Sequence, residues 1–252
     1  MQTKVLILGM GYVGTALARV LVENCSVLGT YQTYNPHLVH PQFMAMPYSL
    51  GDKFPSQWAD YSTWVCLLPP SSSDLYVSLL REWIQYAQQS NVNHVIYTSS
   101  SSVFGQQEGH YTEHDVVYPV TESAQKIAQV EQAFLNSQIE HITILRLAGL
   151  FDDERHPVYR LAKQVSLPNG SQYVNMVHRE DVVNALRYAI KNPKGKLIRH
   201  IVNPHHPTRQ DFYQAEAKRL NIGLADFQYT SRITGKVFAT AYDDFPVPSI
   251  GM

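Results

Sequence analysis

A glycine-rich turn at residues 9–14 is the feature that most constrains how this chain folds. The turn, GMGYVG, follows the apolar run Lys4–Leu8 directly and opens an amphipathic stretch at Val13–Val22. A strand, a GxGxxG turn and a helix in this order are typical of the first βαβ unit of a Rossmann-type fold. Glycine turns also join strands to helices in α/β proteins that bind nothing, but here the strand, the spacing and the helix occur together.

Each glycine has a physical task in such a turn. Gly9 permits the tight bend, Gly11 lets the backbone approach a pyrophosphate without a Cβ in the way, and Gly14 lets the helix lie close to the strand. The helix N-terminus supplies unpaired N–H groups and the positive end of the helix dipole. We therefore expect the pyrophosphate of a nicotinamide dinucleotide to bind here. The expected contacts are Gly9, Gly11, Tyr12, Val13 and Gly14.

Short apolar runs alternate with helical patterns along the chain. The alternation predicts an α/β protein with a Rossmann-type, doubly wound parallel sheet and helices on both faces. The predicted strands are Lys4–Leu8, Ser26–Thr30, Phe43–Ala45, Trp64–Leu68, His94–Thr98, Ile142–Leu147 and His200–Val202. The predicted helices are Val13–Val22, Ser73–Ser90, Thr121–Gln138, Arg179–Lys191 and Thr208–Leu220.

The alternation is lost at residues 151–174 and 205–252, which we expect to form a small C-terminal substrate-binding lobe. Residues 1–150 and 175–204 then form the dinucleotide-binding Rossmann domain. Within the lobe, Thr208 and Asp211 have the spacing of a capping box, which predicts that a helix starts just after Pro207.

Composition excludes several classes of partner. The net charge of −1 gives no positive field for the phosphates of a nucleic acid. Cys25 and Cys66 are too few for a disulfide framework, and no Cys/His cluster has the spacing of a metal site. No apolar run approaches the ~20 residues of a membrane span, and the start of the chain lacks the pattern of a signal peptide. We expect a cytoplasmic protein with a small-molecule partner and without metal, membrane or nucleic acid.

The end of the second predicted strand bears on the choice of cofactor. NAD-specific sites usually place Asp or Glu there, where it binds the ribose diol. This chain has Thr30, Tyr31 and Gln32 instead, with no carboxylate to repel a 2′-phosphate and no arginine to bind one. Both NADP and NAD stay open, and the missing carboxylate favours NADP. These three residues are the expected contacts to the adenosine ribose.

Four further segments carry a resemblance to a known family. They are HVIYTSSSSVFG from His94, ILRLAGLFDDER from Ile144, NMVHREDVVNAL from Asn175 and IVNPHHPTRQDFYQAEAKRL from Ile201. In this order they are similar to segments of the extended short-chain dehydrogenase/reductases, the NAD-dependent epimerase/dehydratases. The resemblance runs from Val5 to about residue 220, and the run LLPP at residues 67–70 resembles an atypical branch of that family.

The resemblance implies an NAD(P)-binding epimerase, dehydratase or reductase that acts on a sugar nucleotide or a similar hydroxylated small molecule. Ser100 matches the catalytic serine or threonine that hydrogen-bonds the reacting oxygen, and Ser101 lies beside it. Arg155 and His178 are expected substrate contacts, although His178 fits equally well as a buried histidine that ties a loop to a helix. Residues that would flank the cofactor are Leu67, Leu68, Pro69, Ser99, Leu147, Ala148 and Gly149. Serine runs are also common in turns, so the serine segment has a purely structural interpretation as well.

One part of the family pattern is missing. In the family, a tyrosine and a lysine lie four residues apart on one helix. The lysine lowers the pKa of the tyrosine and binds the nicotinamide ribose. The matching helix here has Lys126, but the residue four before it is Glu122, which predicts a surface ion pair. Tyr118, just before this helix, is the candidate that would reach the site from another position. Without a placed tyrosine the acid/base step loses ~10²–10⁴-fold in rate.

Two hypotheses of function follow from these observations. The first is an enzyme in which Ser100 polarises the reacting oxygen, with Lys126 and Tyr118 as further candidates. The second is an NADP(H)-binding sensor or scaffold protein without turnover. A reactive-cysteine enzyme is a distant third, because Cys66 lies in a buried strand without an activating base. The resemblance also implies a possible homodimer through two long helices, but the apolar stripe of one of them favours packing against its own sheet. That stripe consists of Leu75, Leu79, Trp83 and Tyr86.

Overall fold

The computed structural model describes residues 2–90, 92–228 and 234–250. Its centre is a seven-stranded sheet in the order β10-β7-β5-β4-β1-β2-β3, with every neighbouring pair parallel. These strands are β1 (Thr3–Leu8), β2 (Cys25–Tyr31), β3 (Met44–Pro47), β4 (Thr63–Cys66), β5 (His94–Ser100), β7 (His141–Leu147) and β10 (Lys196–Ile201). The longer helices are α1 (Tyr12–Leu21), α2 (Tyr76–Gln89), α3 (Glu122–Leu135), α5 (Arg179–Lys191) and α6 (Arg209–Arg219).

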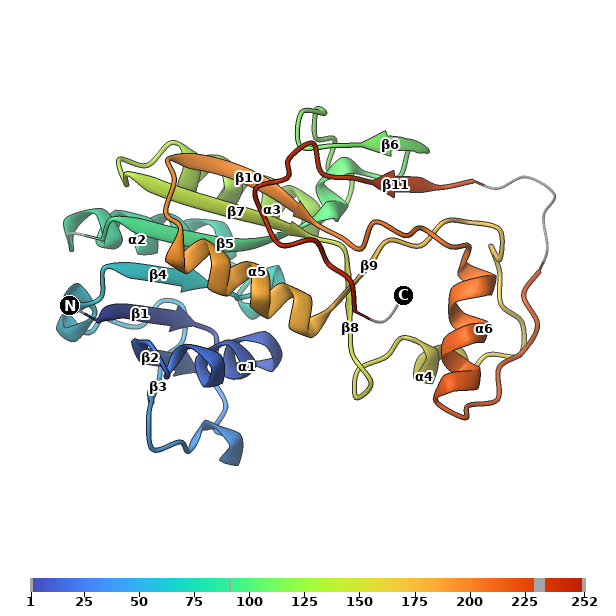
Figure 1. Ribbon diagram of the computed structural model, residues 1–252. Helices are drawn as coiled ribbons and strands as arrows, with labels where there is room; N and C mark the ends of the chain where they lie inside the picture. Colours follow the sequence, from blue (N-terminus) through green and yellow to red (C-terminus); the bar gives the residue numbers. More distant parts are fainter. Residues whose placement is uncertain (1, 91, 229–233, 251–252) are drawn as a thin grey trace.

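The helices lie on both faces of the sheet. The pair α1 and α5 covers one face and the pair α2 and α3 covers the other (Figure 1). The predicted fold class is therefore confirmed, and all seven predicted strands belong to this one sheet. Strand and helix ends differ from the prediction by a few residues. The largest difference is in β10, which starts at Lys196 and ends at Ile201 rather than spanning His200–Val202.

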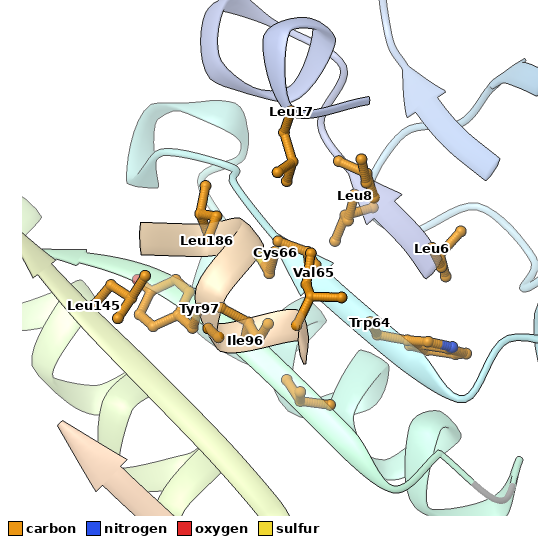
Figure 2. Packing of buried hydrophobic residues seen from close by; sticks show 14 of the residues in the cluster. Leu6, Leu8, Leu17, Trp64, Val65, Cys66, Ile96, Tyr97, Leu145 and Leu186 are labelled. Carbon is orange, nitrogen blue, oxygen red and sulfur yellow. The ribbon is translucent and has the colours of Figure 1, made fainter. Parts of the chain in front are cut away.

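The sheet is buried on both faces, which explains why its strands are almost continuously apolar. Figure 2 shows how strand side chains pack with residues of α1 and α5. The side chains labelled there are Leu6, Leu8, Leu17, Trp64, Val65, Cys66, Ile96, Tyr97, Leu145 and Leu186. All ten are at most 1% exposed. Burial of side chains of this size contributes ~1.5–3 kcal/mol each.

Helix α6 lies beyond the carboxyl ends of the strands (Figure 1). The region around it has its own apolar cluster. Phe151 and Phe212 belong to it, and their rings meet edge to face at 5.7 Å. This region consists of α6, the short helix α4 (Val158–Leu161), and the parallel strand pair β8 (Gly149–Phe151) and β9 (Met176–His178). Thr208 caps α6 by accepting a hydrogen bond from the amide of Asp211 at 3.2 Å, so the helix starts where the capping box predicted.

Residues 236–250 lie outside this apolar cluster and run back toward the central sheet. Strand β11 (Lys236–Phe238) pairs in parallel with β6 (Gly109–Tyr111), and Phe238 joins the main core. Further on, Asp244 accepts two hydrogen bonds from Arg199 of the edge strand β10, at 2.6 and 2.5 Å. The amides of Ser249 and Ile250 donate to one oxygen of Asp181 on α5. The sequence prediction placed these residues in the lobe, and the contacts named above join them to β6, to the edge strand β10 and to α5.

The apolar stripe of α2 divides between the core and the surface. Trp83 is fully buried against the sheet, Leu79 and Tyr86 are half-buried, and Leu75 is 65% exposed. The buried part of the stripe therefore faces the chain's own core. In the described residues, none of the helices combines the length and apolar character needed to cross a membrane. The same residues hold no group of three His, Cys, Asp or Glu side chains placed to bind a metal ion.

Candidate functional site

The glycine turn is fixed to the second strand by two hydrogen bonds. The amide of Met10 donates to the carbonyl of Thr30 at 2.7 Å, and the amide of Gly9 donates to the Thr30 hydroxyl at 3.2 Å. Gly9 has a φ of +105°, a region that favours glycine. Thr30 is 1% exposed, and its side chain anchors the turn while the residue also lines the narrow groove at the end of β2.

The other two glycines face different surroundings. A Cβ on Gly14 would lie 2.2 Å from the carbonyl oxygen of Gly9, so only glycine allows α1 to pack this closely. A Cβ on Gly11 would meet nothing within 4 Å. Gly11 is also the N-cap of α1 without a side-chain cap, and the first turn of the helix holds no acidic residue. The amides of that turn are therefore open to an incoming anion, and the residues fit a dinucleotide pyrophosphate.

Two grooves lie near the turn, and both include Leu68, whose side chain a Cβ on Gly9 would meet. One is a narrow groove of about 30 Å³ at the end of β2, lined by Gly9, Tyr31, Gln32 and Leu68 among others. A side chain there has to shift before an adenine ring can enter. The other, of about 170 Å³, lies at the ends of β4 and β5 and also includes Leu68. It is lined by Leu67, Leu68, Pro69, Pro70, Tyr97, Thr98, Ser99, Ser100, Ile127 and Leu147. We call the second one the Ser100 groove.

The Ser100 groove brings together six residues that the sequence proposed separately, namely Leu67, Leu68, Pro69, Ser99, Ser100 and Leu147. Ser100 is half-buried, and its hydroxyl accepts a hydrogen bond from the amide of Ser102 at 3.1 Å. It thereby caps the short 3₁₀ helix Ser101–Phe104, which begins with Ser101 itself. Ala148 and Gly149 continue from the same strand, and the Ala148 amide donates to Ile201 on β10 at 3.1 Å.

A buried ion pair lies directly beneath the serine turn. Glu131 of α3 and Arg146 of β7 are 1% and 4% exposed, and Arg146 binds both carboxylate oxygens, at 3.0 and 2.8 Å. The Ser99 hydroxyl donates to the same carboxylate at 2.5 Å. The pair therefore fixes the end of β5 just before Ser100. Sequence reasoning missed it, although a glutamate in the apolar stripe of α3 and an arginine within the apolar strand ILRL were both visible signals.

The α3 side chain that faces the Ser100 groove is Ile127. Its neighbour Lys126 turns away and forms the expected ion pair with Glu122 at 2.7 Å. Tyr118 is 65% exposed and does not line the groove. Neither catalytic candidate from this region is thus brought to Ser100.

Two other tyrosines bear on acid/base chemistry. The Tyr97 hydroxyl, beneath the groove, lies 3.0 Å from the Tyr76 hydroxyl, and burial raises the pKa of both phenols far above the neutral range. A Tyr-x-x-x-Lys spacing does occur once in the sequence, at Tyr159 and Lys163, so the pair is missing from the helix that carries it in the family but not from the chain. It lies on and just after α4, where the Tyr159 hydroxyl donates to the Asp153 carbonyl at 2.8 Å. Neither residue lines the Ser100 groove.

The two expected substrate residues lie apart from that groove. His178 caps α5, because its Nδ1 accepts a hydrogen bond from the amide of Glu180 at 3.3 Å. The Arg155 guanidinium lies over the Tyr12 ring, 4.5 Å from its centre. Arg179 also lies over this ring, at 4.7 Å, and forms an ion pair with Asp152 at 3.0 Å.

Cys66 lies in the core between β1 and β5 and has no exposed surface. Burial raises the pKa of its thiol to about 12. The nucleophilic thiolate is therefore scarce at neutral pH, which disfavours the reactive-cysteine hypothesis.

Comparison with known proteins supports the fold. No protein-family model matches the chain. Protein YeeZ of Escherichia coli (strain K12) is 34% identical over 155 residues, which are 62% of this chain and 56% of YeeZ, so the match spans little more than half of that relative. A structure of UDP-glucuronic acid 4-epimerase from Bacillus cereus in complex with NAD has a TM-score of 0.78 at 17% identity, covering 94% of this chain and 89% of that one.

A putative NAD-dependent epimerase/dehydratase from Methylobacillus flagellatus has a TM-score of 0.76 at 21% identity, covering 95% of this chain and 89% of that one. At this level of identity the likeness concerns the fold. The chain has the fold of the NAD-dependent epimerase/dehydratases, which confirms the resemblance predicted from the sequence at that level.

Proposed function

We propose that this chain binds a nicotinamide dinucleotide and acts as an epimerase, dehydratase or reductase on a sugar nucleotide or a similar hydroxylated small molecule. The observation that carries the proposal is the glycine turn, where Gly11 caps the open N-terminus of α1 and Gly9 lines a narrow groove that shares Leu68 with the Ser100 groove. The pyrophosphate would bind at the turn, and the nicotinamide would lie between Leu67, Pro69 and Leu147. When bound, the nicotinamide accepts or supplies a hydride.

The protein's own part in the chemistry would rest on Ser100. Its hydroxyl already accepts one hydrogen bond and is free to donate its proton toward a reacting oxygen. The Glu131–Arg146 pair would hold this turn in place through Ser99. Lys126 and Tyr118 lie outside the groove, so the proton exchanged in the acid/base step at the reacting oxygen would come from solvent or go to it. We therefore expect slow turnover, and we expect the pH dependence of the turnover rate to show no tyrosine ionisation.

The nicotinamide dinucleotide we propose is NADP(H). Tyr31 and Gln32 stand where an NAD-specific site carries a carboxylate, so nothing at the end of β2 repels a 2′-phosphate. The YeeZ match leaves the substrate open, so we propose only its chemical class.

A second candidate function is a cofactor-binding sensor or scaffold protein. The observation that favours it is Ile127, an apolar side chain that faces Ser100 from α3 where acid/base chemistry would call for a titratable group. A sensor needs oxidised and reduced cofactor to shift the protein between states of different affinity for a partner or for a second copy. Sedimentation with NADP and with NADPH tests this, and identical profiles would count against it.

Substitution of Ser100 separates the two candidates. Dinucleotide binding is measured by fluorescence titration, and turnover of UDP-sugars is followed by NMR, for Ser100→Ala and for Ser102→Ala. Ser102 is an exposed serine of the same turn outside the groove and serves as the matched control. We expect Ser100→Ala to lower turnover ~100-fold or more with little change in dinucleotide affinity. Binding without any turnover in the wild type would favour the sensor, and absence of binding would refute both.

A further inference from the structure

A row of buried polar side chains crosses the sheet beneath the serine turn. Ser99 of β5 is paired in register with Arg146 of β7, and Arg146 is paired with His200 of β10. These three strands are neighbours at one edge of the sheet (Figure 1). Residues paired in register on parallel strands point to the same face. Ser99, Arg146 and His200 are 5%, 4% and 5% exposed, so the row is closed to solvent. We call it the Ser99–His200 row.

Arg146 and His200 contact the same aromatic ring. It belongs to Phe104, the last residue of the 3₁₀ helix that Ser100 caps. The Arg146 guanidinium lies 5.1 Å from the centre of this ring, and the His200 ring meets it edge to face at 5.3 Å. The two side chains are therefore neighbours, and both lie against the serine turn.

The hydrogen bonds of His200 fix its neutral form. Its Nδ1 lies 2.8 Å from the Ala239 carbonyl, and it donates because a carbonyl can only accept. The neutral ring therefore carries its proton on Nδ1. His200 Nε2 and Arg146 Nη1 are buried, and neither makes a hydrogen bond to a described residue. Protonation of Nε2 would place a second cation beside the Arg146 guanidinium.

The groups that face His200 decide when it is protonated. Burial lowers the pKa of the ring below its ordinary value, the Glu113 carboxylate opposes this effect, and Arg146 adds to it. Glu113 accepts the His200 amide at 2.7 Å. Glu131 also favours the charged ring, and the exposed Asp115 carboxylate interacts with it. The ring is therefore neutral at neutral pH and takes up its proton only in acid.

We propose that His200 is a positioning residue that makes the serine turn sensitive to pH, acting on Ser99 through Arg146 and Glu131. With a neutral His200, Arg146 binds both oxygens of Glu131, and this carboxylate holds the Ser99 hydroxyl. With a charged His200, two cations repel each other and compete for one carboxylate, so the hold on Ser99 and on the adjacent Ser100 weakens. The consequence for turnover rests on the proposed function, whereas the coupling of His200 to the turn does not.

The experiment follows NMR signals of the cofactor-free chain from neutral pH down to the pH at which it unfolds. The signals are those of the His200 ring, the Arg146 Nε–H and the Ser100 amide. The variant is His200→Gln, whose side-chain amide can still donate to the Ala239 carbonyl but does not titrate. The matched control is His94→Gln, a second buried histidine, at the other end of β5. Thermal unfolding verifies that each variant is folded.

In the wild type we expect the Arg146 and Ser100 signals to shift with the midpoint of the His200 ring. That step should disappear in His200→Gln and persist in His94→Gln. Turnover by the wild type should fall ~tenfold per pH unit below the same midpoint, and this fall should be absent in His200→Gln.

An Arg146 signal that stays fixed while the His200 ring titrates would overturn the inference. A step that survives in His200→Gln would do the same, as would a ring that stays neutral until the chain unfolds. The wild-type titration is decisive by itself if His200→Gln does not fold. Because the NMR signals are read without cofactor, failure of every dinucleotide to bind would refute the proposed function and leave the coupling standing.

Discussion

Separate replacement of Gly11 and Gly14 by alanine should distinguish ligand binding from folding at the glycine turn. The added methyl group of Gly14→Ala would lie 2.2 Å from the Gly9 carbonyl oxygen, well inside van der Waals contact. That oxygen belongs to the backbone, so the turn itself has to move. The methyl group of Gly11→Ala would lie in open space, at a backbone φ of −86°, outside the positive-φ region that requires glycine.

These geometries set the expected magnitudes. Overpacking against the backbone costs ~3 kcal/mol, which for a chain of this size lowers Tm by ~6–12 °C. Alanine in place of glycine at an N-cap costs below ~1 kcal/mol, which keeps the fall in Tm under ~4 °C. In the bound state, however, the Gly11 methyl group would occupy the path by which a pyrophosphate approaches the amides of α1. We expect Gly11→Ala to weaken dinucleotide binding at least tenfold, or ~1.4 kcal/mol.

The assay is thermal unfolding followed by circular dichroism, with calorimetric titration of NADPH and NADH into each folded variant. We expect Gly14→Ala to lose stability and Gly11→Ala to lose dinucleotide binding. If Gly11→Ala binds both dinucleotides as tightly as the wild type, the open end of α1 is not the phosphate site. If Gly14→Ala is as stable as Gly11→Ala, the close contact with Gly9 is not what requires a glycine there.

Three further predictions concern other parts of the molecule. Glu131→Gln leaves the buried charge of Arg146 unpaired and should cost ~3–5 kcal/mol in urea unfolding, whereas the double replacement Glu131→Leu with Arg146→Met should cost much less. Burial lowers the pKa of His94 to about 4, from 6.5 in the unfolded chain, so the unfolded state binds the proton first as the pH falls. Stability should decline between about pH 6.5 and 4 by up to ~3 kcal/mol, and His94→Gln should flatten that decline in unfolding free energy. Asp181→Ala removes the acceptor for the last two described amides, so limited proteolysis followed by mass spectrometry should show earlier cleavage near the C-terminus, and an unchanged rate would contradict this.

The sequence by itself determined the sheet and the glycine turn, because both depend on local signals. A strand buried on two faces has to be apolar along its whole length, and the GxGxxG spacing fixes which residues face the helix, the strand and the open side. The cap of α6 at Thr208 was equally local, since its hydrogen bond joins residues three apart. The Lys126–Glu122 ion pair was predictable for the same reason.

The tertiary structure alone decided which side chains meet, because those contacts join residues far apart in the chain. It turned Ile127 rather than Lys126 toward Ser100, since helix α3 packs by the face that carries Glu131 and its contacts to Ser99 and Arg146. It gathered Arg19 and Arg155 in one cleft across 136 positions of sequence. Residues 236–250 returned to the sheet because Asp244 and Asp181 supply hydrogen-bonding partners there. Pairings of this kind depend on how the elements pack, and neither periodicity nor spacing within one segment specifies them.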